Sequence, residues 1–94
     1  MAPKWTHSTS KHGIPRSDAI HALLHASYRA VLSRQEEDGR VVLFIGPPHA
    51  QALGEDEIEV LVHEFPGTGR EAVVFHVMSL GPKFRRYREE HPDA

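Results

Sequence analysis

An apolar run at residues 72–78, rich in β-branched and aromatic side chains, constrains the fold more than any other segment. A run of this length and composition predicts a buried strand. Gly81 and Pro82 end it, and proline is favoured in the first turn of a helix, so a short helix is predicted at residues 83–90. The chain is therefore expected to carry His76 along a strand directly into a basic and aromatic segment.

Three further strands are predicted before this one. Residues 28–33 and 58–63 show the two-residue period of a half-buried strand. Residues 40–45 form a nearly continuous apolar run, which is typical of a central strand. Turns are predicted at residues 36–39, which end in Asp-Gly, and at the Pro-Gly-Thr-Gly sequence of residues 66–69. The order of these segments predicts a four-stranded antiparallel meander.

A helix of about ten residues is predicted before the first of these strands. It is expected to begin at Asp18 with Ser17 as its N-cap, and a carboxylate in the first turn suits the helix dipole. Ile20, Leu23 and Leu24 follow at helical spacing and predict its apolar face. Residues 1–16 show neither the helical nor the strand period, so most of this segment is predicted to be irregular.

Together these elements predict a small α+β protein. It has an N-terminal helix, a four-stranded antiparallel meander with one face covered by helix, and a short basic C-terminal helix. The predicted organisation is a flexible N-terminal arm at residues 1–10, a single domain at residues 11–90 and a tail at residues 91–94. The 94 residues suffice for one hydrophobic core and not for two.

The composition also bounds the cellular setting. Cysteine is absent, which excludes disulfide bonds, thiolate metal ligands and a cysteine nucleophile, and fits a reducing compartment. The N-terminus lacks the apolar core of a signal peptide. The longest apolar run, residues 41–45, is far shorter than the roughly 20 residues that a membrane-spanning helix needs. We therefore expect a soluble cytoplasmic protein with no membrane partner.

Motifs of the common nucleotide and catalytic sites are missing. The sequence has no P-loop, no Gly-x-Gly-x-x-Gly and no Gly-x-Ser-x-Gly elbow. His21 and His25 lie one helical turn apart and could offer two nitrogens to a metal, but no third and fourth ligand occur at suitable spacing. A solvated or packing role is favoured for both histidines, so no metal and no other cofactor is expected.

Charge is distributed unevenly along the chain. Acidic residues between Glu55 and Glu59 are interpreted as an exposed strand edge whose charges discourage pairing with another strand. The formal net charge of -2 argues against a general nucleic-acid coat protein. The net charge does not exclude a local basic site, and four cations cluster near the C-terminus: Lys83, Arg85, Arg86 and Arg88.

The C-terminal segment combines the side chains that RNA cleavage without a metal requires. Such cleavage needs a base for the 2′-hydroxyl, cations for the phosphate oxygens and an acid for the leaving oxygen. His76 could transfer protons, and Lys83 and Arg85 could bind the phosphate. Phe84 and Tyr87 could stack on unpaired bases. Taken one at a time, each residue is better explained by packing or by a solvated helix face.

Short motifs are spread over residues 11–90. They are the Lys-His-Gly-Ile start at residues 11–14, a helix with Ala19, a last strand with Ser79, and a charged tail with Tyr87 and Glu89-Glu90. In this order they resemble the BrnT toxins of bacterial type II toxin-antitoxin systems. His76-Val77-Met78 and Pro82-Lys83-Phe84 are also similar to motifs of a group of small actinobacterial toxin-like proteins.

The resemblance implies a compact RelE-like ribonuclease fold, RNA cleavage that restrains translation, and neutralisation by a cognate antitoxin protein. By position, Lys11 and His12 correspond to the Lys-His pair of the BrnT toxins, and Ser79 corresponds to the serine of their last strand.

The chain departs from that pattern beside the serine. BrnT sequences tend to carry arginines there, whereas this chain has His76 on one side and Gly81 on the other. Fewer arginines would stabilise the phosphate charge less. Either Lys83 and Arg85 substitute for them, or the fold has been retained without the nuclease.

The leading hypothesis is a metal-independent endoribonuclease toxin. His76 or His12 is expected to act as general base, with Lys83 and Arg85 on the phosphate. The residues expected to bind RNA are Lys11, Ser79, Phe84, Arg86, Tyr87 and Arg88. The expected partners are RNA and an antitoxin, in a homodimer or a toxin-antitoxin hetero-oligomer. The alternative is a non-catalytic module of the same fold that binds a partner protein or regulates transcription.

Overall fold

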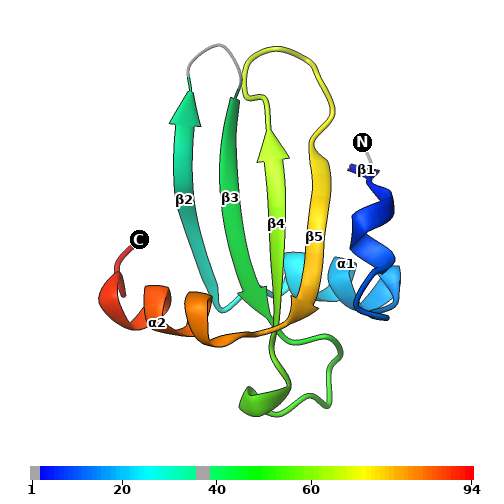
Figure 1. Ribbon diagram of the computed structural model, residues 1–94, viewed down its shortest axis with the longest axis vertical. Helices are drawn as coiled ribbons and strands as arrows, with labels where there is room; N and C mark the ends of the chain where they lie inside the picture. The colour runs from blue at the N-terminus through cyan, green and yellow to red at the C-terminus, as the bar shows by residue number, and fades with distance from the viewer. Residues whose placement is uncertain (1–2, 36–38) are drawn as a thin grey trace.

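A five-stranded mixed sheet with two α-helices organises residues 3–35 and 39–94, which are the residues that the computed structural model describes (Figure 1). The strand order is β1-β5-β4-β3-β2. The strands are β1 Lys4–Trp5, β2 Tyr28–Gln35, β3 Gly39–Gly46, β4 Ile58–Glu64 and β5 Val73–Ser79. The helices are α1 Arg16–Leu24 and α2 Pro82–Glu90. The α+β class is confirmed, and so are the antiparallel meander of β2 to β5 and the helix after Gly81.

The fifth strand was not predicted. β1 pairs with β5 in parallel, with Lys4 opposite Val73 and Trp5 opposite Val74. A 3-10 helix at His7–Ser10 follows, and the Ser8 hydroxyl donates a hydrogen bond to the Phe75 carbonyl at 2.7 Å. The prediction of an irregular segment was therefore wrong at these residues. Their hydrogen-bond partners lie on β5, far along the chain, so no local sequence pattern predicts these two elements.

α1 packs on the sheet through its smallest side chains. Ala19 and Ala22 are fully buried, whereas Leu24 is 74% exposed. A Cβ atom added to Gly46, at the end of β3, would lie 2.6 Å from the Ala22 carbonyl oxygen. The helix backbone thus approaches the strand so closely that only small residues fit between them. The predicted apolar face was wrong for Ile20 and Leu24, which are exposed.

The start of α1 also differs from the prediction. Its N-cap is Pro15 in an extended conformation, so Ser17 lies inside the helix and does not cap it. Asp18 lies in the first turn, as predicted. The proline explains the earlier start, because its fixed φ angle suits the beginning of a helix.

The two helices cover opposite faces of the sheet, which corrects the prediction of one covered face. Ala19 and Ala22 of α1 share a core cluster with Val60 and Val74. On the other face, Phe84 of α2 packs with a second cluster, whose members are Tyr28, Ala30, Leu43 and Ile45. Neighbouring strand residues point to opposite faces, so both faces have a core. Figure 1 shows both helices near the same end of the sheet, α2 toward β2 and α1 toward β5.

Of the two turns predicted between strands, one lies within the described residues. The turn expected at residues 36–39 lies largely outside the described residues, which resume at Gly39 opposite Gln35. The turn at residues 66–69 is present, with the Thr68 N–H donating to the Phe65 carbonyl at 3.3 Å. Within the described part of the chain, neither helix has the length and apolar character needed to cross a bilayer.

Candidate functional site

A buried carboxylate on the central strand β4 anchors the candidate site. Glu59 is only 3% exposed. Its Oε1 accepts a hydrogen bond from the Gly81 backbone N–H at 2.8 Å, and its Oε2 lies 2.7 Å from Nε2 of His76. Both carboxylate oxygens therefore have partners, as a buried charge requires. The contact to Gly81, the N-cap of α2, also fixes where that helix begins.

The interpretation of residues 55–59 as an exposed strand edge was wrong. β4 lies between β3 and β5, so it has no free edge. Glu55 and Asp56 are exposed, but they belong to a 3-10 turn that precedes the strand. The sequence carried one signal for the position of Glu59, because the two-residue period of residues 58–63 places it on the same face as Leu61. Ile58 and Val60 are buried on the other face.

His76 lies on β5 beside Glu59. The strand register places His76 opposite Leu61, and Met78 opposite Glu59. The His76 side chain is 28% exposed, so one part of the ring meets the carboxylate and another reaches solvent. When the ring is neutral, a proton on Nε2 is donated to Glu59, which leaves the lone pair of Nδ1 free to accept a proton.

The structure brings His12 next to His76. The two ring centroids are 5.9 Å apart, with the rings inclined at 70°. The segment before His12 is held against β5 by β1 and by the Ser8 hydroxyl, as described above. In the sequence analysis, His12 and His76 were alternatives for the role of general base. The fold places both of them at one site.

A hollow of about 410 Å³ opens beside this histidine pair, between the sheet and the start of α2. We call it the α2 hollow. Its lining residues are Glu59, Leu61, His76, Met78, Gly81, Pro82, Lys83 and Phe84. Lys83 is exposed, and its Nζ lies 5.3 Å from the Phe84 ring centroid. The hollow thus combines a histidine, a cation and an apolar wall.

The remaining cations of α2 have different surroundings. Arg85 and Arg86 are exposed, and an Arg85 guanidinium nitrogen lies 3.4 Å from the Leu80 carbonyl oxygen. Arg88 instead forms an ion pair with Glu57 at 3.0 Å, which ties α2 to the segment just before β4. Arg85 and Arg86 remain candidates for phosphate contacts, whereas Arg88 anchors the helix.

The aromatic residues of α2 contribute to packing. Phe84 is 7% exposed within the second core cluster, and it also lines the α2 hollow. Its predicted contact with a base therefore stays a prediction, and only the part of the ring toward the hollow could make it. Tyr87 is half-buried and stacks on His91 with centroids 4.2 Å apart. The Tyr28 hydroxyl donates to the His91 carbonyl at 2.6 Å, which holds the end of α2. Burial raises the pKa of Tyr28.

Two other predicted residues lie at the surface. Ser79 is exposed at the end of β5, opposite Ile58, and Lys11 is exposed just after the 3-10 helix. His21 and His25 have ring centroids 4.4 Å apart, and Nδ1 of His21 lies 2.9 Å from the Pro47 carbonyl oxygen. Over residues 3–35 and 39–94, no group of three or more histidine, aspartate or glutamate side chains is arranged to hold a metal ion.

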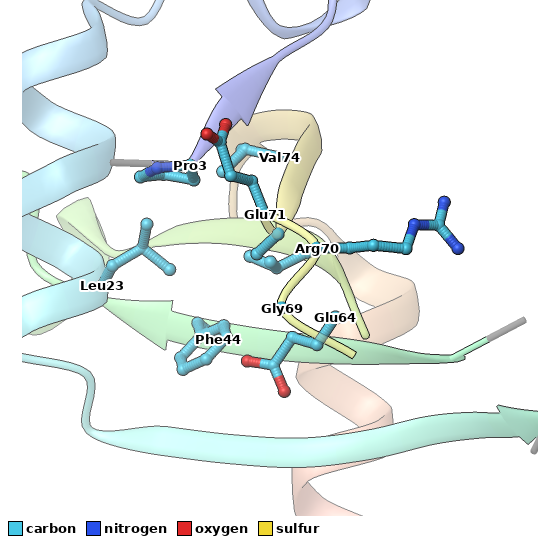
Figure 2. Close-up of a pocket in the computed structure, with 10 residues that line it drawn as sticks. Pro3, Leu23, Phe44, Glu64, Gly69, Arg70, Glu71 and Val74 are labelled. Atoms are coloured by element: carbon cyan, nitrogen blue, oxygen red, sulfur yellow. The ribbon is translucent and has the colours of Figure 1, made fainter. Parts of the chain in front are cut away.

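A second hollow, of about 460 Å³, lies on the face of the sheet that α1 covers (Figure 2). We call it the α1 groove. Its apolar lining includes Leu23, Phe44 and Val74, and the carboxylates of Glu64 and Glu71 lie at its border. Figure 2 shows the Arg70 side chain extending away from the groove, and its guanidinium lies 3.7 Å from the Phe65 ring centroid. The sequence did not indicate this groove.

Comparison of the chain with protein-family models, with curated proteins and with solved structures finds no match.

Proposed function

We propose that this protein is a metal-independent endoribonuclease whose proton transfers are made by His12 and His76. The observation that carries the proposal is the 5.9 Å approach of the two imidazole rings beside the buried carboxylate of Glu59. Two imidazoles at this separation allow one phosphodiester group to contact both. Histidine is the side chain most often used for proton transfer near neutral pH.

The reaction follows from the surroundings of each ring. Nδ1 of His76 takes the proton of a ribose 2′-hydroxyl, and the resulting oxygen attacks the adjacent phosphorus. The bond from phosphorus to the 5′ oxygen breaks, and protonated His12 gives its proton to that oxygen. The products are a 2′,3′-cyclic phosphate and a 5′-hydroxyl. Proton exchange with solvent then restores both rings.

Glu59 supports the assignment of His76 as the base. A carboxylate 2.7 Å from Nε2 holds the ring in one orientation and stabilises the imidazolium that forms when Nδ1 takes the proton. His12 is exposed, and no carboxylate among residues 3–35 and 39–94 forms an ion pair with it, which suits the acid that exchanges its proton with solvent.

Lys83 and Arg85 supply the positive charge for the phosphate in this proposal. Lys83 lines the same hollow as His76, and Arg85 follows on the exposed surface of α2. Charge developing on the phosphate oxygens is stabilised most by cations that are already in place. These two residues would then take over the role of the arginines that flank the serine in BrnT toxins.

The cellular role that we propose is that of a toxin of a type II toxin-antitoxin system, in which RNA cleavage restrains translation until an antitoxin binds. The order of motifs from Lys11 to Glu90 and the antiparallel meander followed by a basic helix support a RelE-like or BrnT-like protein. Expression in a bacterial host should arrest growth, and the double substitution His12→Ala, His76→Ala should relieve the arrest.

The decisive test is incubation of the purified protein with a structured RNA in EDTA, followed by mapping of the product ends. The wild type should leave 2′,3′-cyclic phosphate or 3′-phosphate ends. His12→Ala and His76→Ala should each lower the rate by about 100-fold or more. His49→Ala is the matched control, because His49 is exposed in the connection between β3 and β4. Wild-type rates in both site variants would overturn the assignment.

The α1 groove favours a second candidate function, a non-catalytic module that binds a partner protein. Glu71 lies at its border without a hydrogen bond or ion pair to any described residue. An apolar side chain next to a lysine or arginine on the partner would fill the groove and pair with this carboxylate. The product of a short neighbouring reading frame is the partner to test. Glu71→Lys should weaken the complex, whereas Glu89→Lys, exposed on α2, should not.

A further inference from the structure

The α2 hollow has a part that the proposed reaction leaves unused. Proton transfer and phosphate binding involve His76, Glu59 and Lys83. Half of the eight lining residues are apolar instead: Leu61, Met78, Pro82 and Phe84. A hollow that combines apolar walls with a few fixed polar groups is typical of a site that buries part of a ligand.

The strand register places two ionisable and two apolar side chains in one patch on β4 and β5. Glu59 lies opposite Met78, and Leu61 lies opposite His76. The hydrogen-bonded pair of Glu59 and His76 therefore spans one diagonal of the patch, and Leu61 and Met78 occupy the other. A ribose that presents its 2′-hydroxyl to His76 is consequently flanked by apolar side chains of both strands.

The start of α2 closes the hollow on another side. Pro82 and Phe84 form part of its lining, and the hydrogen bond between Gly81 and Glu59 holds this end of the helix against the sheet. Lys83, Arg85 and Arg86 lie in the same turns of the helix. The apolar wall thus has one cation beside it, Lys83, and two more follow on the same helix. This arrangement matches a ligand with an apolar ring and neighbouring phosphates, as in single-stranded RNA.

We infer that the α2 hollow is a nucleobase subsite, which holds the base on the 5′ side of the scissile phosphate. This inference rests on the proposed function, because it places the base on the ribose whose 2′-hydroxyl meets His76. Glu59 already uses both carboxylate oxygens, and His76 and Lys83 act on the ribose and the phosphate. The base is therefore held by burial of its faces, and a purine, with the larger face, binds more tightly than a pyrimidine.

The chain offers a direct reporter for this subsite. It contains two methionines, Met1 and Met78, so a protein labelled with ¹³C at the methionine methyl groups has two methyl signals. Met78→Leu identifies the signal of Met78. The deoxydinucleotides dApdA and dTpdT serve as probes, because they lack the 2′-hydroxyl and are not cleaved. We expect dApdA to shift the Met78 signal and to bind about threefold or more tightly than dTpdT.

A substitution provides the second measurement. Met78→Gln keeps the length of the side chain but makes it polar, and should raise the KM for a short RNA about tenfold with a smaller change in kcat. Leu53→Gln is the control, since Leu53 is exposed outside the hollow. Circular dichroism and the melting temperature confirm that each variant is folded.

The outcomes separate the subsite from the nuclease. If RNA cleavage depends on His12 and His76 but dApdA does not shift the Met78 signal, the subsite is overturned and the proposed nuclease activity is supported. A shift of the Met78 signal in a protein that cleaves no RNA overturns the nuclease and leaves a nucleotide-binding hollow. Equal affinity for dApdA and dTpdT overturns recognition by the area of the base.

Discussion

Glu59 and His76 form a hydrogen-bonded pair of 2.7 Å between neighbouring strands, although the carboxylate is almost fully buried and the imidazole reaches solvent. The second carboxylate oxygen holds the backbone N–H of Gly81 at the start of α2. One side chain therefore connects the histidine, the sheet and the basic helix. If the site is catalytic, the activity depends on this connection.

Glu59→Gln should lower the rate of RNA cleavage by about 10- to 100-fold while the protein stays folded. Glutamine keeps the shape of the side chain and can still accept from Gly81, but it loses the negative charge that stabilises protonated His76. Cleavage assays of Glu59→Gln, His76→Ala and the double variant measure the coupling. Residues that act as a unit give non-additive losses, so fully additive losses would show that Glu59 does not act through His76.

Ser8→Ala should impair cleavage more than it impairs stability. The Ser8 hydroxyl donates to the Phe75 carbonyl on β5 and so helps to position the segment that carries His12. Loss of one exposed hydrogen bond costs about 1 kcal/mol or less. Ser10→Ala is the matched control, because its hydroxyl bonds only to the nearby His7 carbonyl. Equal cleavage rates of the two variants would show that this contact does not position His12.

Phe84→Ala should destabilise the protein by about 3–5 kcal/mol, because the ring belongs to the core on the α2 face. Arg86→Ala, on the exposed side of the same helix, should change the free energy of unfolding by less than about 0.5 kcal/mol. Urea titrations followed by circular dichroism measure both values. A small loss for Phe84→Ala would contradict the core position of the ring.

Gly46→Ala should destabilise the contact between α1 and β3. The added Cβ would meet the Ala22 carbonyl oxygen at 2.6 Å, so the helix has to shift, at a cost of about 1–3 kcal/mol. Gly54→Ala is the control, because no atom lies within 4 Å of its added Cβ. Thermal unfolding should give a clearly lower Tm for Gly46→Ala alone, and equal Tm values would speak against the close packing of α1.

The stability of the protein should decrease in alkaline solution through Tyr28. Burial, with a smaller effect of nearby Tyr87, raises the pKa of Tyr28 above its ordinary value of about 10. The folded state therefore binds this proton more tightly, so the stabilisation is complete below pH 10 and is lost as the pH rises from there through the folded-state pKa. Tyr28→Phe should remove this part of the pH dependence in denaturant titrations between pH 8 and 11. An unchanged slope would contradict it.

The local patterns of the sequence were sufficient for the meander and for α2. The two-residue period and the apolar runs depend only on neighbouring residues, and they located β2 to β5. His76 lies on β5 and Lys83 lies in the first turn of α2, only seven residues further along the chain. Their proximity could therefore be predicted from the sequence. Gly81 and Pro82 marked the start of α2 for a similarly local reason.

The tertiary structure alone decided which candidate residues meet. Glu59 looked like one of several exposed acidic residues, and it is buried because β4 lies inside the sheet. His12 lies near His76 because β1 pairs with the far edge of β5. α1 buries alanines, and leaves Leu24 exposed, because it packs against the backbone at Gly46. A periodic pattern determines which side chains share a face, but strand order and long-range pairing determine what covers that face.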